Sequence, residues 1–205
     1  VRSPSEFNED HIPGAINLPV LDDKERKKIG IIYKKKSSFE AKVLGSSLVT
    51  KNISEYLIKN LKNKNGAWKP LVYCWRGGQR SRALCLIMQE IGWRVNQLEG
   101  GYKHYRNDIT KKLQKISPKL KIILISGKTG TGKTKLLNQI KSNNGQILDL
   151  EGIANHKGSL LGRDLKNNQP SQKLFESLLY DALKNKNLKK NIYLEAESSK
   201  IGNLH

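Results

Sequence analysis

The stretch that decides the fold is Gly127-Lys128-Thr129-Gly130-Thr131-Gly132-Lys133-Thr134. It fits the pattern G-x-x-x-x-G-K-[ST] at every fixed position, between an apolar run at residues 122–125 and a stretch with helical spacing. In such a loop the glycines let backbone N–H groups point at one phosphate, and the following helix adds partial positive charge. We therefore predict a phosphate-binding loop whose contacts come from Gly127, Gly130, Gly132, Lys133 and Thr134.

The same motif predicts a place for Mg²⁺. The hydroxyl of Thr134 is expected to lie on the ion, and an acidic side chain at a neighbouring strand end would complete the site. Asp149 is the acid that we assign, with Glu195 and Glu197 as alternatives that follow a later strand. Each of these acids can equally be an ordinary residue at the end of a strand.

A second glycine-rich loop carries a cysteine, in the run Cys74-Trp75-Arg76-Gly77-Gly78-Gln79-Arg80-Ser81. It lies between a predicted strand and a predicted helix, so the thiol should face loop N–H groups and a helix N-terminus. Together with the charges of Arg76 and Arg80, this setting is expected to lower the pKa of Cys74. The same cradle would stabilise a persulfide or its selenium counterpart, although a buried structural cysteine is the alternative. Cys85 lies inside the following helix and is expected to pack.

Strands and helices alternate along the chain, which predicts two α/β domains with parallel sheets. We expect a rhodanese-like arrangement over residues 1–115 and a P-loop domain over residues 116–205, with the boundary in the basic segment 114–121. Ser81 is expected to cap the helix that ends at Gly92. The expected strands are a strand end at Val1 and residues 15–18, 71–73, 95–98, 121–126, 147–150 and 192–194. The expected helices are a short helix start after the Ser3-Pro4 turn and residues 21–33, 41–61, 102–113, 134–142 and 174–183.

The charge of the chain favours a polyanionic partner. Its 38 Lys and Arg exceed its 18 Asp and Glu, for a net charge of +20, and a field of this sign speeds the capture of nucleic acids. A Lys-rich and Asn-rich composition without function is the alternative. No apolar run approaches the roughly 20 residues of a membrane helix, so no membrane is expected. Two cysteines without a disulfide framework indicate a reducing, cytoplasmic setting.

Two parts of the chain resemble a rhodanese domain. The first is the N-terminal part, with Val1-Arg2-Ser3-Pro4, Glu6-Phe7, His11-Ile12-Pro13-Gly14-Ala15 and Asn17-Leu18-Pro19. The second is Leu98-Glu99-Gly100-Gly101-Tyr102, which follows the helix after Cys74. Asp10 stands where that family usually has Gly. The cysteine loop is also one residue longer than in common sulfurtransferases, because Arg80 is the sixth residue after Cys74 and Gln79 the fifth. That length matches rhodanese-fold phosphatases, so loop length alone leaves a phosphatase open.

The two loops together resemble bacterial tRNA 2-selenouridine synthases. The similar segments are Tyr73 to Gly78 with Arg80-Ser81, Ile91-Gly92-Trp93-Arg94-Val95, Gln97 to Tyr102, Leu21-Asp22-Asp23, Asp149-Leu150-Glu151-Gly152, Ala154 to Ser159, Gln169-Pro170-Ser171-Gln172 and Glu197-Ser198. The resemblance implies replacement of the sulfur of 2-thiouridine by selenium from selenophosphate at the wobble position of tRNA, with geranyl diphosphate as a further substrate. It implies that Cys74 is essential, that the phosphate loop holds a phosphate-bearing ligand such as the diphosphate, and that Mg²⁺ is a candidate ion.

Some alternatives remain open at this point. Trp75 can stack on the target base or simply pack. The whole chain can instead be a sulfurtransferase or phosphatase with an accessory phosphate loop, or a non-catalytic module that binds RNA or nucleotides. The family's second domain continues beyond residue 205, and the chain opens directly on a motif, so we expect a shortened chain. The sequence indicates no particular oligomeric state.

Overall fold

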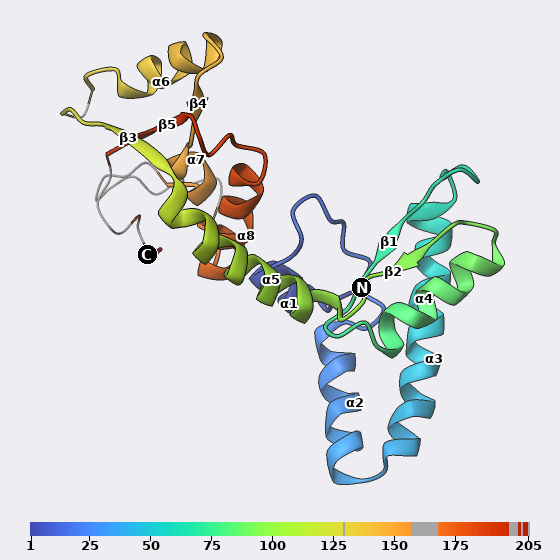
Figure 1. Ribbon diagram of the computed structural model, residues 1–205. Coiled ribbons are helices and arrows are strands. Elements are labelled where there is room, and N and C mark those ends of the chain that lie inside the picture. The colour runs from blue at the N-terminus through green and yellow to red at the C-terminus, as the bar shows by residue number, and fades with distance from the viewer. Residues whose placement is uncertain (129, 157–167, 197–200, 202, 205) are drawn as a thin grey trace. The chain divides into compact units, whose positions relative to one another are not determined.

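The structure is a computed structural model that describes residues 1–128, 130–156, 168–196, 201 and 203–204. It divides into two compact units, Val1–Arg106 and Asn107–His205 (Figure 1). The division falls inside helix α5 (Gly101–Ile116), in which Tyr102 is buried in the first unit and Ile109 in the second. The predicted boundary at residues 115 and 116 is at the end of the same helix and stays a prediction.

The first unit is built mostly from helices around a short sheet. Its elements are α1 (Pro4–Glu9), α2 (Asp23–Lys35), α3 (Ser38–Tyr56), η1 (Leu57–Leu61), β1 (Leu71–Val72), α4 (Gln79–Glu90) and β2 (Asn96–Gln97). Strands β1 and β2 are parallel, with Leu71 opposite Asn96 and Val72 opposite Gln97. The expected parallel arrangement is therefore confirmed, in a sheet much shorter than predicted.

The N-terminal segment differs from the prediction, because residues 1–70, all of which are described, contain no strand. Pro4 occupies the first turn of α1, and Ser3 with Glu6 forms a capping box. The expected helix start is therefore confirmed, whereas the strand end expected at Val1 is wrong. Residues 15–18 have no neighbouring strand to pair with, and Ala15 N–H instead closes a turn on the Ile12 carbonyl at 3.0 Å.

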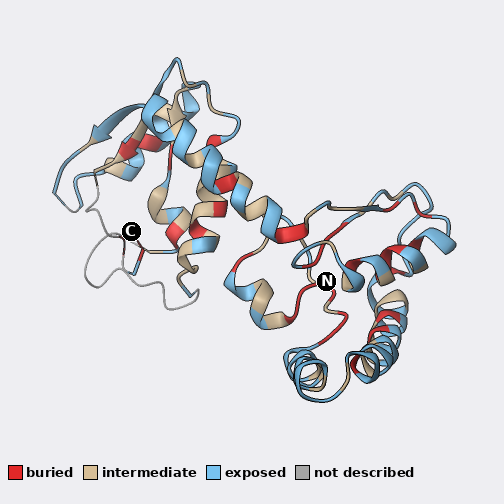
Figure 2. Ribbon diagram, turned by 60° about the horizontal axis from the view of Figure 1, so that its bottom comes forward, coloured by how far each residue is buried: buried red, intermediate tan, exposed pale blue. Residues whose placement is uncertain are grey.

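Helices α3 and α4 supply the core of the first unit. Their buried residues recur at helical spacing and pack with the end of β1: Ala41, Val49, Ile53, Leu84, Cys85, Met88 and Val72. Cys85 thus packs, as expected. Each large apolar side chain buried in this way contributes roughly 1.5–3 kcal/mol. Figure 2 shows the contrast with α2, which contains no buried residue.

The second unit carries a three-stranded parallel sheet. Its elements are η2 (Ser117–Lys119), β3 (Lys121–Ile125), α6 (Lys133–Ser142), β4 (Gln146–Ile147), α7 (Leu150–Ala154), α8 (Gln172–Leu183) and β5 (Asn191–Glu195). The strand order is β3-β5-β4, with Ile122 opposite Ile192 and Ile147 opposite Tyr193. One face of the sheet packs on a core of Leu148, Leu183, Ile192 and Leu194.

Two details of this unit bear on the site. The strand predicted over residues 147–150 ends at Ile147, because the Asp149 side chain caps α7 by accepting a hydrogen bond from Gly152 N–H. The apolar strand β3 is largely exposed, with Ile122 at 47% and Leu124 at 60%. Among the helices of the described residues, none is long and apolar enough to cross a membrane.

Candidate functional site: a cysteine loop and a phosphate loop

Cys74 lies directly after β1, at the floor of the loop that leads into α4. Its side chain is buried, and Sγ accepts hydrogen bonds from Gly78 N–H and from the Ser81 hydroxyl, each at 3.2 Å. Burial raises the pKa of the thiol, but the hydrogen bonds from Ser81, Gly78 and Arg76 outweigh it, so the pKa of Cys74 is lowered. The predicted thiolate is therefore favoured by hydrogen bonds rather than by the charge of the arginines.

Ser81 has a different role from the one predicted. Helix α4 begins at Gln79 with Gly78 as its N-cap, so Ser81 lies within the first turn and is fully buried. Gln97 Nε2 donates to the Ser81 hydroxyl oxygen at 2.9 Å and also to the Gly77 carbonyl. Because Gln97 fills an acceptor position of the hydroxyl, the single Ser81 proton points to the other side, where Cys74 Sγ and the Gly78 carbonyl oxygen both lie 3.2 Å from the hydroxyl oxygen. Gln97 lies in a segment that resembles the synthases, but no local pattern gives it a role, because it reaches the loop only through the pairing of β2 with β1.

Two glycines allow the loop to pack closely on the segment that follows β2. Gly77 and Gly101 have φ of +68° and +57°, a region that favours glycine. A Cβ on Gly101 would lie 2.5 Å from both the Cys74 carbonyl oxygen and the Gly77 nitrogen. The loop is further held by Tyr102 N–H, which donates to the Cys74 carbonyl at 2.9 Å. The conformation of the cysteine loop thus depends on residues 24 to 28 positions away.

The two loop arginines lie in different settings. Arg76 is exposed. Arg80 donates to Glu6 at 2.8 Å, and Arg26 forms an ion pair with the other oxygen of Glu6 at 3.1 Å. Burial raises the pKa of Glu6, but the bond and charge of Arg80, the Ser3 N–H bond and the charge of Arg26 together outweigh it, so the pKa is lowered. Glu6 therefore holds Arg80 as part of a charge cluster, and a catalytic role for Arg76 and Arg80 stays a prediction.

Trp75 is both packed and accessible. Its ring centroid lies 5.3 Å from that of Tyr102 and 5.4 Å from the guanidinium carbon of Arg2, yet Trp75 is 37% exposed. Tyr102 is fixed in turn by its hydroxyl, which donates to Asp10 at 2.6 Å. Asp10, where a rhodanese usually has Gly, thus orients the aromatic neighbour of Trp75.

The second loop has the geometry expected for phosphate binding. Gly130 and Gly132 have φ of +86° and +83°, and α6 begins at Lys133 directly after them. Lys133 Nζ donates to the Gly127 carbonyl at 3.0 Å, so the ammonium group lies over the loop. Thr129, Glu197 and the matched segment 157–159 lie outside the described residues.

The carboxylate that contacts Thr134 is Glu195, one of the alternative acids, and the assignment of Asp149 to the metal side stays a prediction. The Thr134 hydroxyl donates to Glu195 Oε1 at 2.8 Å, across the gap between α6 and the end of β5. Asp149 Oδ1 instead accepts from Gly152 N–H at 2.8 Å. Within the described residues no group of three or more His, Cys, Asp or Glu could hold a metal. The donors present, one hydroxyl and one carboxylate, fit Mg²⁺, which takes few protein ligands beside phosphate oxygens and water.

Comparisons with known proteins support both halves. Residues 1–108 match the family described as rhodanese-like domain, and residues 120–205 match the tRNA 2-selenouridine synthase AAA domain. The tRNA 2-selenouridine synthases of Sulfurovum sp. and Bdellovibrio bacteriovorus are 39% and 38% identical over 89% and 87% of this chain, and that of Nitrosomonas europaea is 35% identical over all of it.

The aligned parts make up 50%, 47% and 54% of those three relatives, so the chain spans about half their length. A solved structure, the N-terminal domain of a putative ATP/GTP binding protein from Clostridium difficile, is 36% identical over 53% of this chain and 84% of its own, with a TM-score of 0.48. The order of the two matched domains is the order of the cysteine loop and the phosphate loop. The chain therefore belongs to the tRNA 2-selenouridine synthase family, with a rhodanese-like domain matched over residues 1–108 and the family's AAA domain matched over residues 120–205.

Proposed function

We propose that this chain acts in the replacement of sulfur by selenium at 2-thiouridine in the wobble position of tRNA, with selenophosphate as the selenium donor. The observation that carries the proposal is the cradle around Cys74, where Gly78 N–H and the Ser81 hydroxyl both meet Sγ at 3.2 Å. Such a cradle stabilises negative charge on sulfur, and it would equally stabilise a selenium anion attached to that sulfur. Relatives named tRNA 2-selenouridine synthase support this reaction over a plain sulfurtransferase or a phosphatase.

The phosphate loop is proposed to hold a second, phosphate-bearing substrate. Geranyl diphosphate is our candidate, with its diphosphate over Gly127, Gly130 and Gly132 and its charge met by Lys133. Mg²⁺ held through Thr134 and Glu195 would screen the phosphate charge. The support is the fit between the loop geometry and a diphosphate: positive φ at two glycines, a helix start at Lys133 and a hydroxyl paired to a carboxylate.

Recognition of tRNA is proposed to combine charge with one stacking residue. The net charge of +20 favours a polyanion. Trp75, which keeps 37% of its exposure beside the cysteine loop, would stack on the target base. Because Cys74 and Cys85 are both free thiols, we place the reaction in the cytoplasm.

The experiment that tests the proposal is mass spectrometry of nucleosides from tRNA that bears 2-thiouridine, after incubation with the protein, selenophosphate and geranyl diphosphate. We expect 2-selenouridine with the parent protein, none with Cys74→Ala, and an unchanged yield with Cys85→Ala, the matched control on a buried packing cysteine. Equal yields from the two cysteine variants would remove Cys74 from the mechanism. Release of phosphate from a phosphoester, without any change of the tRNA, would support the phosphatase alternative.

A further inference from the structure

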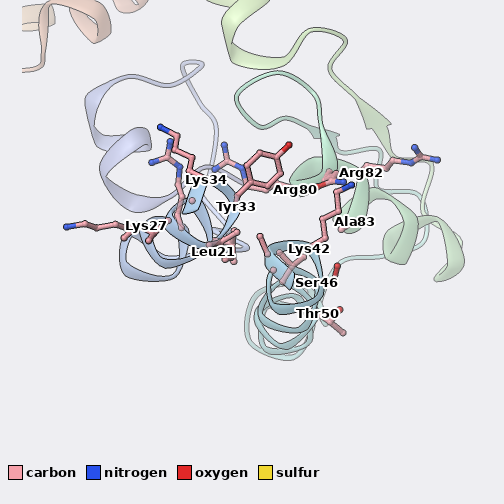
Figure 3. Close-up of a pocket in the computed structure, with 18 of the residues that line it drawn as sticks. Leu21, Lys27, Tyr33, Lys34, Lys42, Ser46, Thr50, Arg80, Arg82 and Ala83 are labelled. Carbon is pink, nitrogen blue, oxygen red and sulfur yellow. The ribbon is translucent and has the colours of Figure 1, made fainter. Parts of the chain in front are cut away.

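The first unit contains a cavity of about 900 Å³ between α2, α3 and the first turns of α4 (Figure 3). Small-molecule sites have volumes of roughly 300–1,000 Å³, so this one is large enough for a ligand of substantial size. Gln79 and Arg80 line it, and both lie in the first turn of α4, directly after the loop that carries Cys74.

The cavity arises from how α2 and α3 pack. Helix α2 has no buried residue, and it contributes Gly30 where a larger residue would fill the space between the helices. A Cβ on Gly30 would meet nothing within 4 Å. Gly45 on α3 also lines the cavity, and its nearest neighbour there is Ile29, 3.5 Å from a Cβ. Helices α2 and α3 thus form a hairpin, and side chains do not fill the space between them.

Its floor is apolar. Leu21, Ala41 and Val49 are buried at its base, with exposures of 7%, 1% and 8%. Ile31 and Leu86 stand at its margin, with 47% and 51% of their surface exposed. Exposed aliphatic side chains that continue a buried apolar floor are the usual lining of a site for a hydrocarbon group.

Its rim is cationic. Seven of the described residues that line it are Lys or Arg, and none of the described lining residues is Asp or Glu. Arg26 and Arg80 share Glu6 as a partner, which offsets part of their charge. The other five cations of the lining are Lys27, Lys34, Lys35, Lys42 and Arg82. In Figure 3 the side chain of Lys42 extends toward the side that carries Arg80, whereas Lys27 and Arg82 extend away from the cavity.

We propose that this cavity binds a small amphiphilic anion, with its hydrocarbon chain on the floor of Leu21, Ala41 and Val49 and its phosphate or other anionic head group at the lysine and arginine rim. Neither the apolar floor nor the cationic rim would by itself indicate an amphiphilic anion. A nucleic acid would meet the rim but would gain little from an aliphatic floor on which Tyr33 is the single aromatic residue among the described lining. A neutral apolar ligand would not require a rim without carboxylates.

Ligand binding in this cavity does not require the chemistry at Cys74. This binding goes beyond the proposed function, because geranyl diphosphate is assigned there to the phosphate loop, and the cavity is a separate site within the rhodanese-like unit. Binding can be measured without tRNA or selenophosphate, so failure of the cavity and failure of the selenium reaction are distinguishable.

The first test is calorimetric titration of the protein with hexyl, octyl and decyl phosphate below their micelle concentrations. Burial of a methylene contributes roughly 0.8 kcal/mol, so each is expected to tighten binding by about fourfold. The series is repeated in Lys133→Ala, which removes the main cation of the phosphate loop. We expect the dependence on chain length to persist in that variant. Affinity that does not change with chain length, or that disappears with Lys133→Ala, would overturn the proposal.

The second test uses variants of the cavity. Gly30→Leu places a side chain in the open space while raising the helix propensity of α2, so a loss of at least tenfold in octyl phosphate affinity cannot come from unfolding. Lys42→Glu is expected to weaken binding about tenfold, and Lys51→Glu, an exposed control on the same helix outside the lining, should change it less than twofold. Equal effects of the two lysine variants would overturn the proposal.

Two further outcomes would replace this ligand with another partner. Competition by tRNA, with no measurable binding of any alkyl phosphate, would make the hairpin an RNA surface. Sedimentation with phosphatidylglycerol vesicles that Lys42→Glu abolishes, again without alkyl phosphate binding, would make it a lipid-headgroup surface.

Discussion

At the scale of single residues, reactivity at Cys74 depends on one hydroxyl and on the amide that orients it. The thiol is buried, which by itself opposes ionisation, and the Ser81 hydroxyl is the largest of the effects that reverse this. Gln97 holds Ser81 from β2. The arginines that suggested an activated cysteine in the sequence contribute less, because Arg80 is paired with Glu6. A glycine-rich loop after a strand predicts the position of the thiol but not the donors that meet it.

Ser81→Ala should therefore slow alkylation of Cys74 by iodoacetamide at neutral pH. A hydrogen bond to a charged group is worth about 1.5–3 kcal/mol, so we expect a loss on the order of tenfold. Removing this donor raises the pKa of the thiol, and the rate should recover as the pH rises. The measurement uses a Cys85→Ala background so that one thiol reacts.

The control for this prediction is Ser47→Ala, which removes an exposed hydroxyl on α3. It should leave the pH profile of alkylation in place. A profile that is the same in Ser81→Ala and Ser47→Ala would show that the Ser81 bond does not govern the ionisation of Cys74.

Contacts of single residues also distinguish Glu195 from Asp149, the two carboxylates considered for Mg²⁺. Thr134 donates to Glu195, whereas Asp149 caps α7. Glu195→Gln should weaken the Mg²⁺-dependent binding of pyrophosphate by about tenfold with little loss of stability. Asp149→Ala should lower the free energy of unfolding by about 1 kcal/mol, as expected for a lost cap, and leave the dependence on Mg²⁺ unchanged. Titration with and without Mg²⁺, beside urea unfolding, measures both, and the reverse pattern would restore Asp149 as the metal-side acid.

At the scale of elements, helices were easier to predict than strands and turns. Apolar spacing indicated α3, α6 and α8 nearly to their ends, because that spacing is local. Residues 15–18 read as a strand but lack a partner, and the strand predicted at 147–150 ends early because Asp149 begins a helix. Gln97 and the cavity between α2 and α3 depend on contacts between distant segments, so no local pattern could indicate them.

The turn at Gly101 makes one such contact testable. Gly101→Ala should lower the free energy of unfolding by about 3 kcal/mol, because its Cβ would overlap the Cys74 carbonyl and the Gly77 nitrogen at 2.5 Å. Gly92→Ala is the matched control. Gly92 also has positive φ, +100°, but an added Cβ meets nothing within 4 Å, so a cost of about 1 kcal/mol is expected from the backbone alone. Urea unfolding of both variants gives the comparison, and equal costs would mean that the loop and the turn do not pack as described.

At the scale of the whole molecule, the charge of +20 is spread over the chain rather than gathered in one basic segment. The first unit, residues 1–106, contains 20 basic and 10 acidic side chains, for a net +10, and the second unit, residues 107–205, contains 18 and 8, for a net +10. Both units therefore carry an excess of positive charge, and the exposed Arg76 places part of it beside Cys74. A substrate that is itself a polyanion would be attracted by each unit.

This distribution predicts how tRNA binding responds to salt. If the proposed function holds, the tRNA releases counterions at every phosphate that it places against a lysine or arginine. Six such contacts would lower the affinity by about a thousandfold from about 50 to about 200 mM salt. Filter binding over a series of salt concentrations gives the slope of log affinity against log salt.

Trp75→Ala should lower the affinity at every salt concentration without changing that slope, because stacking releases no counterions. A slope near zero would mean that the excess charge is a property of composition, and a Trp75→Ala slope that differs from the parent would place Trp75 among the phosphate contacts rather than against the base.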